Sequence, residues 1–174
     1  HNPDTPGGSG LGFGKTVLPE DLLHCSKDEK VIPVFSHTTS FRTAANLINK
    51  ALNLHIDVQA AIIQENEGVL VSNRIHKKIP IVDEVAQIDA VPIQMPTLVE
   101  VAEPGWTIKS LSNPYQVATL FGLSPTETQK IAPVSISLTG NRSAVVIKTP
   151  KGNIQEKVIR VGKLQLIGTQ LSKE

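Results

Sequence analysis

Apolar and polar residues in the first third of the chain follow a pattern that predicts a strand and then a helix. Residues 31–35 form an apolar run suited to a buried strand, and residues 36–40 are rich in hydroxyl side chains that cap helices. In residues 41–52 the apolar positions recur at three- and four-residue spacing, which places them on one face of about three and a half helical turns. We therefore predict a helix that packs on a sheet.

The chain then predicts a β-hairpin followed by irregular strands. Residues 56–63 and 68–71 are apolar enough to be strands, and the acidic segment 64–67 between them has the length of a hairpin turn. Further on, two apolar stretches at 79–85 and 90–95 contain or border three prolines. Since proline cannot donate to a ladder of hydrogen bonds, we predict irregular strands at sheet edges or strand ends.

Two capping signals predict helices in the last part of the chain. Residues 97–102, which precede them, suit either a strand or a helical turn. Asn113 stands before a proline at the first helical position and predicts a helix that ends near Leu123. Ser124 and Glu127 have the spacing of a capping box, which predicts that another helix begins at once.

Three more strands are predicted near the C-terminus. Residues 143–148, 154–161 and 163–167 alternate enough to be strands, and a turn at 149–153 joins the first two. Together the elements predict a mixed α/β domain that covers residues 1–174, with a largely non-alternating order of strands and helices and no fixed-period repeat.

The composition is that of a globular protein. Of the 174 residues, 40% are apolar and 19% are charged. The net charge of +1 argues against a nucleic-acid partner, and the lack of an apolar run of about eighteen residues argues against a membrane. The single Cys25 excludes an intramolecular disulfide and, with no signal peptide, indicates a reducing, cytoplasmic location. Because the chain begins without methionine, we expect it to be a piece of a longer protein.

The first sixteen residues hold five of the twelve glycines. Because glycine loses more backbone entropy on folding than any other residue, we predict that this run is a loop with something to contact. Gly14-Lys15-Thr16 is like the end of a phosphate-binding loop, but Ser9 stands where that motif needs glycine and no buried strand precedes it. A glycine-rich surface connector is the simpler interpretation.

Three other groups are candidates for chemistry or binding. His24 and Cys25 could form a base and a nucleophile, but adjacent residues point in different directions, so a packing or surface role is favoured. Trp106 suits either a core position or an interface. A basic cluster is expected to be a solvated face, with docking to an acidic partner as the alternative. This cluster consists of Arg74, His76, Lys77 and Lys78.

Five blocks of sequence carry a family resemblance. They are NPDTPGG at 2–8, EGVLVSNR at 67–74, PIVDEV at 80–85, LSNPY at 111–115 and GNRSAVV at 140–146. In this order and spacing, over residues 1 to about 166, they resemble the large subunit of the reactivating factor for adenosylcobalamin-dependent diol and glycerol dehydratases. The resemblance implies a swivelling β/β/α domain, with helices packed on a mixed sheet. In that family the domain is an internal module of a larger chain, whose actin-like ATPase domain lies outside it.

The resemblance also implies a function. The whole factor is a chaperone-like ATPase that binds ATP in the absent domain, opens an inactivated dehydratase and lets damaged cobalamin leave. The module alone is expected to have no enzymatic activity. It binds the factor's small subunit and, by exchange, the diol or glycerol dehydratase. The expected location is the cytoplasm, with association with a bacterial microcompartment as an extension.

In the family a metal ion, Mg²⁺ or Ca²⁺, sits at the contact between the subunits. The positions that match its ligands in the large subunit are Thr5, Asn66 and Asp83. The family usually has Asp where this chain has Asn66. Either the Asn66 carbonyl still coordinates, or Glu67 or Glu65 replaces it, or the site fills only when the small subunit adds a carboxylate. We favour the last of these.

Simpler interpretations stand beside the metal site. Polar residues in a tight turn, such as Asn66 and Glu67, usually cap the backbone. Asp83, if it is buried in its apolar stretch, needs a hydrogen bond, a cation or a raised pKa. A second hypothesis is a small-molecule or metal-binding enzyme domain that acts through the glycine-rich loop and Asp83. A deep cleft beside Thr5 and Asp83 favours this enzyme, whereas an open, partly apolar surface favours a partner protein.

Overall fold

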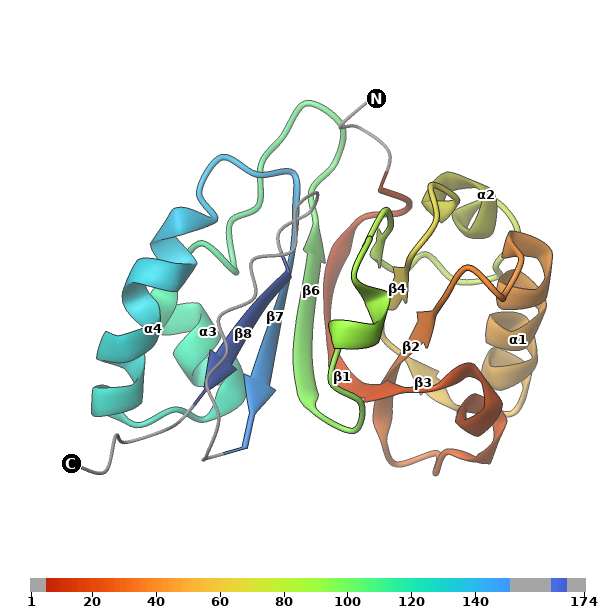
Figure 1. Cartoon of the computed structure of the whole chain (residues 1–174), viewed down its shortest axis with the longest axis horizontal. Helices are drawn as coiled ribbons and strands as arrows, with labels where there is room; N and C mark the ends of the chain where they lie inside the picture. Colours follow the sequence, from red (N-terminus) through yellow and green to blue (C-terminus); the bar gives the residue numbers. More distant parts are fainter. Residues whose placement is uncertain (1–5, 151–163, 169–174) are drawn as a thin grey trace.

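The computed structural model of this protein describes residues 6–150 and 164–168 (Figure 1). The strands are β1 (Gly10–Val17), β2 (Lys30–Phe35), β3 (Asp57–Val58), β4 (Ala61–Ile63), β5 (Ile81–Val82), β6 (Pro96–Val101), β7 (Ser143–Thr149) and β8 (Leu164–Gly168). The helices are α1 (Phe41–Asn53), α2 (Gly68–Ser72), α3 (Pro114–Phe121) and α4 (Pro125–Ser137), with 3₁₀ turns η1 (Pro19–His24) and η2 (Ile88–Ala90). In this part of the chain the strands form one mixed sheet, in the order β5-β4-β2-β1-β6-β7-β8, with β3 paired to β2.

The two halves of the sheet differ in strand direction. β1, β2, β4 and β5 run parallel to one another, whereas β6 is antiparallel to both β1 and β7, and β8 is parallel to β7. α1, α2 and η1 lie on the side of the parallel half, and α3 and α4 lie on the side of the other half (Figure 1). The sheet curls into a half-barrel, so that the edge strand β5 also contacts β6 and β7.

The apolar side chains of the described residues gather in three clusters. One lies between the parallel strands and α1, one between β6, β7 and the helices α3 and α4, and one inside the curled sheet. In β2, Val31 and Phe35 join the cluster beside α1, whereas Ile32 and Val34 join the one inside the sheet. Because alternate residues of a strand point to opposite faces, both faces of this strand are buried. The mixed α/β architecture is as the sequence predicts.

The helices that were predicted from capping signals are confirmed. Ser40 begins α1 by accepting a hydrogen bond from the Thr43 amide at 3.2 Å. Ser124 and Glu127 form the predicted capping box of α4, and Asn113 caps α3. These side chains satisfy amides that the first helical turn leaves without partners, so a local pattern is enough to predict them. None of the helices in the described ranges combines the length and apolarity that a bilayer span requires.

Several predicted strands are also confirmed. The segments 31–35, 143–148 and 163–167 correspond to β2, β7 and β8, and the ambiguous segment 97–102 corresponds to the strand β6. The predicted strand at 154–161 lies outside the described residues.

The predicted hairpin is wrong. Residues 56–63 are divided between β3 and β4, and residues 68–71 belong to the helix α2. The chain then returns to the sheet as β5, which pairs with β4 in parallel. The Val71 amide donates to the Glu67 carbonyl at 3.0 Å, as in a helical turn. A run of four apolar residues is too short for its spacing to distinguish a strand from a helix.

The predicted irregular strands are shorter than expected. Of residues 79–85 only Ile81–Val82 joins the sheet, as an edge strand, which agrees with the position predicted from the prolines. Residues 90–95 do not form a strand, and their first residue, Ala90, ends the 3₁₀ turn Ile88–Ala90. The apolar residues of the 90–95 segment pack inside the curled sheet without joining its ladder.

In the described part of the glycine run, residues 10–16 form a strand and not the predicted loop. Gly10–Val17 is β1, which pairs with β2 on one side and β6 on the other. A methyl group on Gly14 would lie 2.8 Å from the main chain of Lys30, and one on Gly12 would collide with the carbonyl oxygen of Gln59. The glycines therefore let neighbouring backbones approach the sheet closely.

Candidate functional site

Three segments that are far apart in the sequence meet beside the edge strand β5. Gly7 and Ile81 exchange two main-chain hydrogen bonds, with N···O distances of 3.1 and 3.0 Å. The acidic turn lies against the residues that follow β5, because the Glu84 amide donates to the Glu65 carbonyl at 3.1 Å. We call this meeting point the junction. It consists of residues 6–8, 65–68 and 81–85.

Asp83 is the buried carboxylate of the junction. It is 4% exposed, and its Oδ2 accepts a hydrogen bond from the Gly68 amide at 2.9 Å. This bond is one of the three compensations that a buried acid can have. A methyl group on residue 68 would lie 2.8 Å from that oxygen and 3.1 Å from the Gly7 nitrogen. Glycine at this position therefore lets the three segments come together.

Asn66 and Glu67 do not cap the backbone, which was the simpler interpretation of the turn. Asn66 is exposed, and its side chain has no hydrogen-bond partner among the described residues. Glu67 precedes α2, but its side chain makes no capping hydrogen bond. The Asn66 side chain is thus accessible to an ion or to another protein.

The structure describes only part of the predicted metal-ligand set. Thr5 lies outside the described residues, whereas Asn66 and Asp83 both belong to the junction. A hydroxyl, an amide carbonyl and a carboxylate are hard oxygen donors that suit Mg²⁺ or Ca²⁺, so the donor types fit these ions. The set carries a single negative charge, however, which neutralises only half of the charge of a dication. Within residues 6–150 and 164–168 no group of three or more His, Cys, Asp or Glu is arranged to hold a metal.

The surface beside the acidic turn is partly apolar. On α2, Val69 is 46% exposed and Leu70 is 39% exposed, directly after the exposed turn that carries Asn66. Adjacent exposed apolar side chains with a polar border are typical of a surface that another protein covers. These exposed apolar side chains agree with the partner-protein hypothesis, whereas the surface around Thr5 lies outside the described residues.

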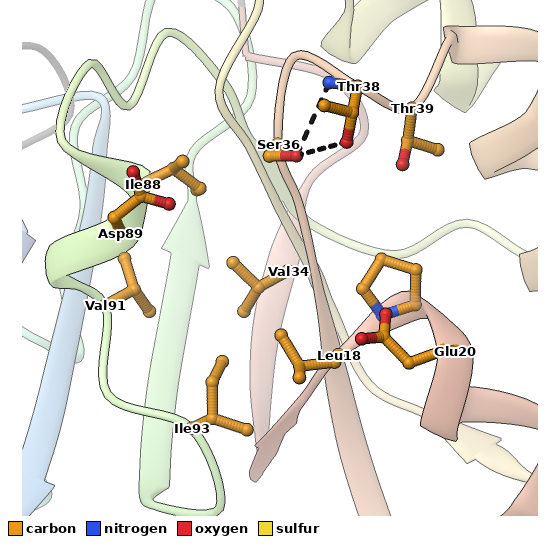
Figure 2. Close-up of a pocket in the computed structure, with 11 residues that line it drawn as sticks. Leu18, Glu20, Val34, Ser36, Thr38, Thr39, Ile88, Asp89, Val91 and Ile93 are labelled. Carbon is orange, nitrogen blue, oxygen red and sulfur yellow. Dashed lines mark hydrogen bonds between the residues drawn. The ribbon is translucent and has the colours of Figure 1, made fainter.

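The pocket in Figure 2 lies elsewhere, between η1, the turn after β2 and the segment 88–93. It has a volume of about 360 Å³. Apolar side chains form its wall, and hydroxyl and carboxylate groups surround them. The wall residues are Leu18, Pro19, Val34, Ile88, Val91 and Ile93, and the polar residues are Glu20, Ser36, Thr38, Thr39 and Asp89. Neither Asp83 nor a glycine of β1 lines this pocket, so the two groups of the enzyme hypothesis do not meet there.

Cys25 has the properties of a packed thiol. Its Sγ donates to the Asp21 carbonyl at 3.4 Å, and its side chain packs against the cluster beside α1. Burial raises the pKa of the Cys25 thiol, and the nearby Glu29 carboxylate raises it further. Because a thiol with a raised pKa remains protonated, this position is unsuited to a nucleophile. The preference for a packing role over a His24–Cys25 pair is supported.

Trp106 lies at the surface, which excludes one of its two alternatives. It is 65% exposed, and the Lys109 Nζ lies 5.4 Å from its ring centroid. A core position is therefore excluded.

Glu100 is a second buried acid, which is not among the residues predicted from the sequence. It is 9% exposed, and its carboxylate accepts hydrogen bonds from the amides of Lys109, Ser110 and Leu111 at 2.8–3.1 Å. These amides belong to the turn before α3, so Glu100 fastens that turn to β6. An acid flanked by valines was the available signal, and it is the same signal that singled out Asp83.

Comparison with known proteins identifies close relatives. A family model of the DD-reactivating factor swiveling domain matches residues 1–154. The chain is 48% identical over 167 residues to the diol dehydratase-reactivating factor large subunit of Klebsiella michiganensis, covering 96% of this chain and 27% of the relative. It is 48% identical over 166 residues to the propanediol dehydratase-reactivating factor large subunit of Salmonella typhimurium, covering 95% and 27%. The chain thus spans about a quarter of the length of these relatives.

Two solved structures share the fold. A diol dehydratase-reactivating factor in its nucleotide-free form matches with a TM-score of 0.84 and 50% identity, covering 89% of this chain and 26% of that chain. A glycerol dehydratase reactivase matches with a TM-score of 0.83 and 47% identity, covering 86% and 25%. These matches confirm both the swivelling α/β fold class and the resemblance carried by the five sequence blocks.

Proposed function

The chain belongs to the family of DD-reactivating factor swiveling domains, and we propose that it is the module by which a reactivating factor holds its small subunit. By exchange of partners, the same surface holds the corresponding dehydratase subunit. The complete factor then uses ATP, bound by another domain, to release damaged cobalamin from an inactivated diol or glycerol dehydratase. It does so in the cytoplasm or in a bacterial microcompartment.

The observation that carries this proposal is the junction. Asp83 is buried yet belongs to a segment that lies directly against the exposed acidic turn, through the Glu84–Glu65 hydrogen bond. Beside that turn, α2 presents the exposed apolar side chains of Val69 and Leu70. Polar ligands next to exposed apolar side chains suit the capture of a protein more than the turnover of a small molecule.

We further propose that Thr5, Asn66 and Asp83 hold Mg²⁺ or Ca²⁺ at this contact. When bound, the ion supplies positive charge that offsets carboxylates from both chains. Since Asn66 adds no charge, the three residues neutralise only half of a dication, and a carboxylate from the small subunit supplies more. The site is therefore completed when the partner binds. This arrangement also explains why a family with Asp at position 66 and a chain with Asn66 can use the same contact.

The proposal is tested by capture of the candidate small subunit on this immobilised chain, with Mg²⁺ or with EDTA. We expect saturable capture in Mg²⁺ and a dissociation constant at least about tenfold higher in EDTA. Asp83→Asn keeps an acceptor for the Gly68 amide but removes the charge, so it should abolish the difference between the two buffers. Asp28→Asn, at an exposed aspartate on another part of the surface, is the matched control.

Asn66→Asp sharpens the test. It restores the charge that the family usually has, so half-maximal capture should need less Mg²⁺ than in the unmodified chain. Capture that is indifferent to EDTA and to Asp83→Asn would overturn the metal bridge. A complete lack of capture in both buffers would overturn the proposed function itself.

A further inference from the structure

The basic cluster after α2 is held in a fixed position on α1. The side-chain amide of Asn49 donates to the Arg74 carbonyl at 2.9 Å and accepts from the His76 amide, also at 2.9 Å. One side chain thus uses both its donor and its acceptor on the main chain of the cluster. A solvated charged segment does not need such a fixed backbone, and a binding surface benefits from one.

Two arginines meet at one aromatic ring in this region. The guanidinium carbon of Arg74 lies 4.6 Å from the ring centroid of Phe41, and that of Arg42 lies 5.3 Å from it. Arg74 also donates through Nη1 to the Leu70 carbonyl at 2.9 Å, which ties it to α2. The ring and this hydrogen bond restrict where the two charges can be, although both residues are exposed.

The charges of these two arginines are not neutralised within the described part of the chain. Lys77 lies 3.9 Å from Asp57, and Lys78 lies 2.9 Å from Glu103. Neither Arg42 nor Arg74 forms an ion pair with any described residue. A pair of exposed guanidinium groups without carboxylates is suited to bind carboxylates of another protein, because each can donate two parallel hydrogen bonds.

The helix α2 connects this pair of arginines to the junction. Its first residue, Gly68, donates its amide to Asp83, and its Leu70 carbonyl accepts from Arg74. The two attachment points are two residues apart on this five-residue helix, which is roughly 3 Å along its axis at 1.5 Å per residue. The exposed Val69 stands between them, and the second attachment point, Leu70, is itself an exposed apolar residue. One short helix therefore links the candidate cation site, two exposed apolar side chains and, through Arg74, a pair of guanidinium groups.

We infer that the partner captured at the junction lies along α2 and presents a second acidic group, distinct from its metal-binding carboxylate, to Arg42 and Arg74. This inference rests on the proposed function, since it concerns the same partner. It adds the chemistry of the partner's surface: apolar side chains flanked on both sides by carboxylates. The guanidinium end attracts the partner at long range and fixes its orientation, whereas the metal end depends on the divalent ion.

The test uses the capture experiment in Mg²⁺ with the double variant Arg42→Gln/Arg74→Gln. We expect the dissociation constant to rise about tenfold at low salt, mainly through slower association, and the difference from the unmodified chain to shrink as the salt approaches about 0.5 M. Lys27→Gln/Lys30→Gln removes two exposed cations from another part of the surface and should change capture less than about twofold. Thermal melting of each variant shows whether the fold is retained.

Arg74→Lys separates charge from the geometry of the guanidinium group. It keeps the positive charge but loses the paired hydrogen bonds, so it should weaken capture by less than the double variant while preserving the salt dependence. If the unmodified chain captures the small subunit and the folded double variant captures it equally well, the inference is overturned while the proposed function stands. If the unmodified chain captures nothing, the proposed function has failed first.

Discussion

Asp83 and Glu100 are both buried acids in apolar surroundings, yet they organise different kinds of structure. Glu100 uses its carboxylate on three consecutive amides of one turn, which lies close to it in the sequence. Asp83 accepts from Gly68, at a point where residues from the N-terminal part, the acidic turn and β5 all meet. The first carboxylate fastens a local turn, whereas the second lies where distant segments form a surface.

The difference teaches that burial of an acid does not by itself mark a functional site. Both carboxylates have exchanged water for backbone amides, which is the ordinary solution for a buried charge. The two acids differ in what surrounds the amides that they bind. Behind Glu100 is the turn that leads into α3, and beside Asp83 is the exposed residue Asn66 with the apolar face of α2.

The largest effect should come from removing the structural acid. Glu100→Ala leaves three amides without an acceptor, one of them in a buried bond, and we expect the free energy of unfolding to fall by about 3 kcal/mol. Urea denaturation measures this change. Glu100→Gln keeps one acceptor oxygen, so its free energy of unfolding should lie between those of the unmodified chain and of Glu100→Ala. A loss below about 1 kcal/mol for the alanine variant would contradict the role of Glu100 as a fastener.

Filling the junction should have a smaller effect on stability. Gly68→Ala places a methyl group 2.8 Å from Asp83 Oδ2, and overpacking of this kind costs about 2 kcal/mol. Unlike Glu100→Ala, it should also weaken Mg²⁺-dependent capture of the small subunit by the folded molecules, because it displaces the carboxylate. Capture normalised to the folded fraction distinguishes the two variants. Equal capture by both would contradict the different roles assigned to Asp83 and Glu100.

Asp83→Asn should separate stability from binding. The amide oxygen can still accept from Gly68, so the free energy of unfolding should fall by less than the roughly 3 kcal/mol expected for Glu100→Ala. Metal-dependent capture should nevertheless be lost. Destabilisation as large as that of Glu100→Ala would mean that Asp83 too is mainly a structural acid.

Glu103 is an exposed acid, and its substitution should have the smallest effect on stability of the acids compared here. The Ser9 hydroxyl donates to Glu103, and Lys78 lies beside it, so the pKa of Glu103 is lowered. Its contribution to stability is present above the unfolded-state pKa of about 4.3 and is lost as the pH falls through the lower folded-state value. Because the group is fully exposed, Glu103→Gln should leave the melting temperature at pH 7 unchanged within error. An NMR titration that finds its pKa at or above the ordinary value would contradict this interpretation.

Local signals predicted part of the fold well. The caps at Ser40, Asn113 and Ser124 each depend on residues within one helical turn, so the helices could be predicted without knowing the tertiary structure. The hairpin prediction was wrong because β4 pairs with β5, which follows α2 in the chain. No local pattern in the sequence encodes that pairing. Gly10, Gly12 and Gly14 alternate along the chain with the two-residue period of a strand. The high glycine content of the same segment favours a loop, which is why the predicted element was wrong here.

The site was predictable only in part. Asp83 stood out as an acid inside an apolar stretch, while Glu100 carried the same signal and was passed over. The family resemblance supplied the proposed ligand set, of which Thr5 lies outside the described residues. The meeting of Arg42 and Arg74 at Phe41 could not be predicted, because these residues come together only when α2 packs against α1.

The pairing of Gly7 with Ile81 has a consequence for association between molecules. β5 is an edge strand, and an unpaired edge can recruit a strand from a second chain and so begin aggregation. Here Gly7 occupies both main-chain groups of Ile81. The same contact that assembles the junction therefore blocks strand addition at this edge. A substitution that breaks the Gly7–Ile81 pairing should increase aggregation and also weaken binding of the partner protein.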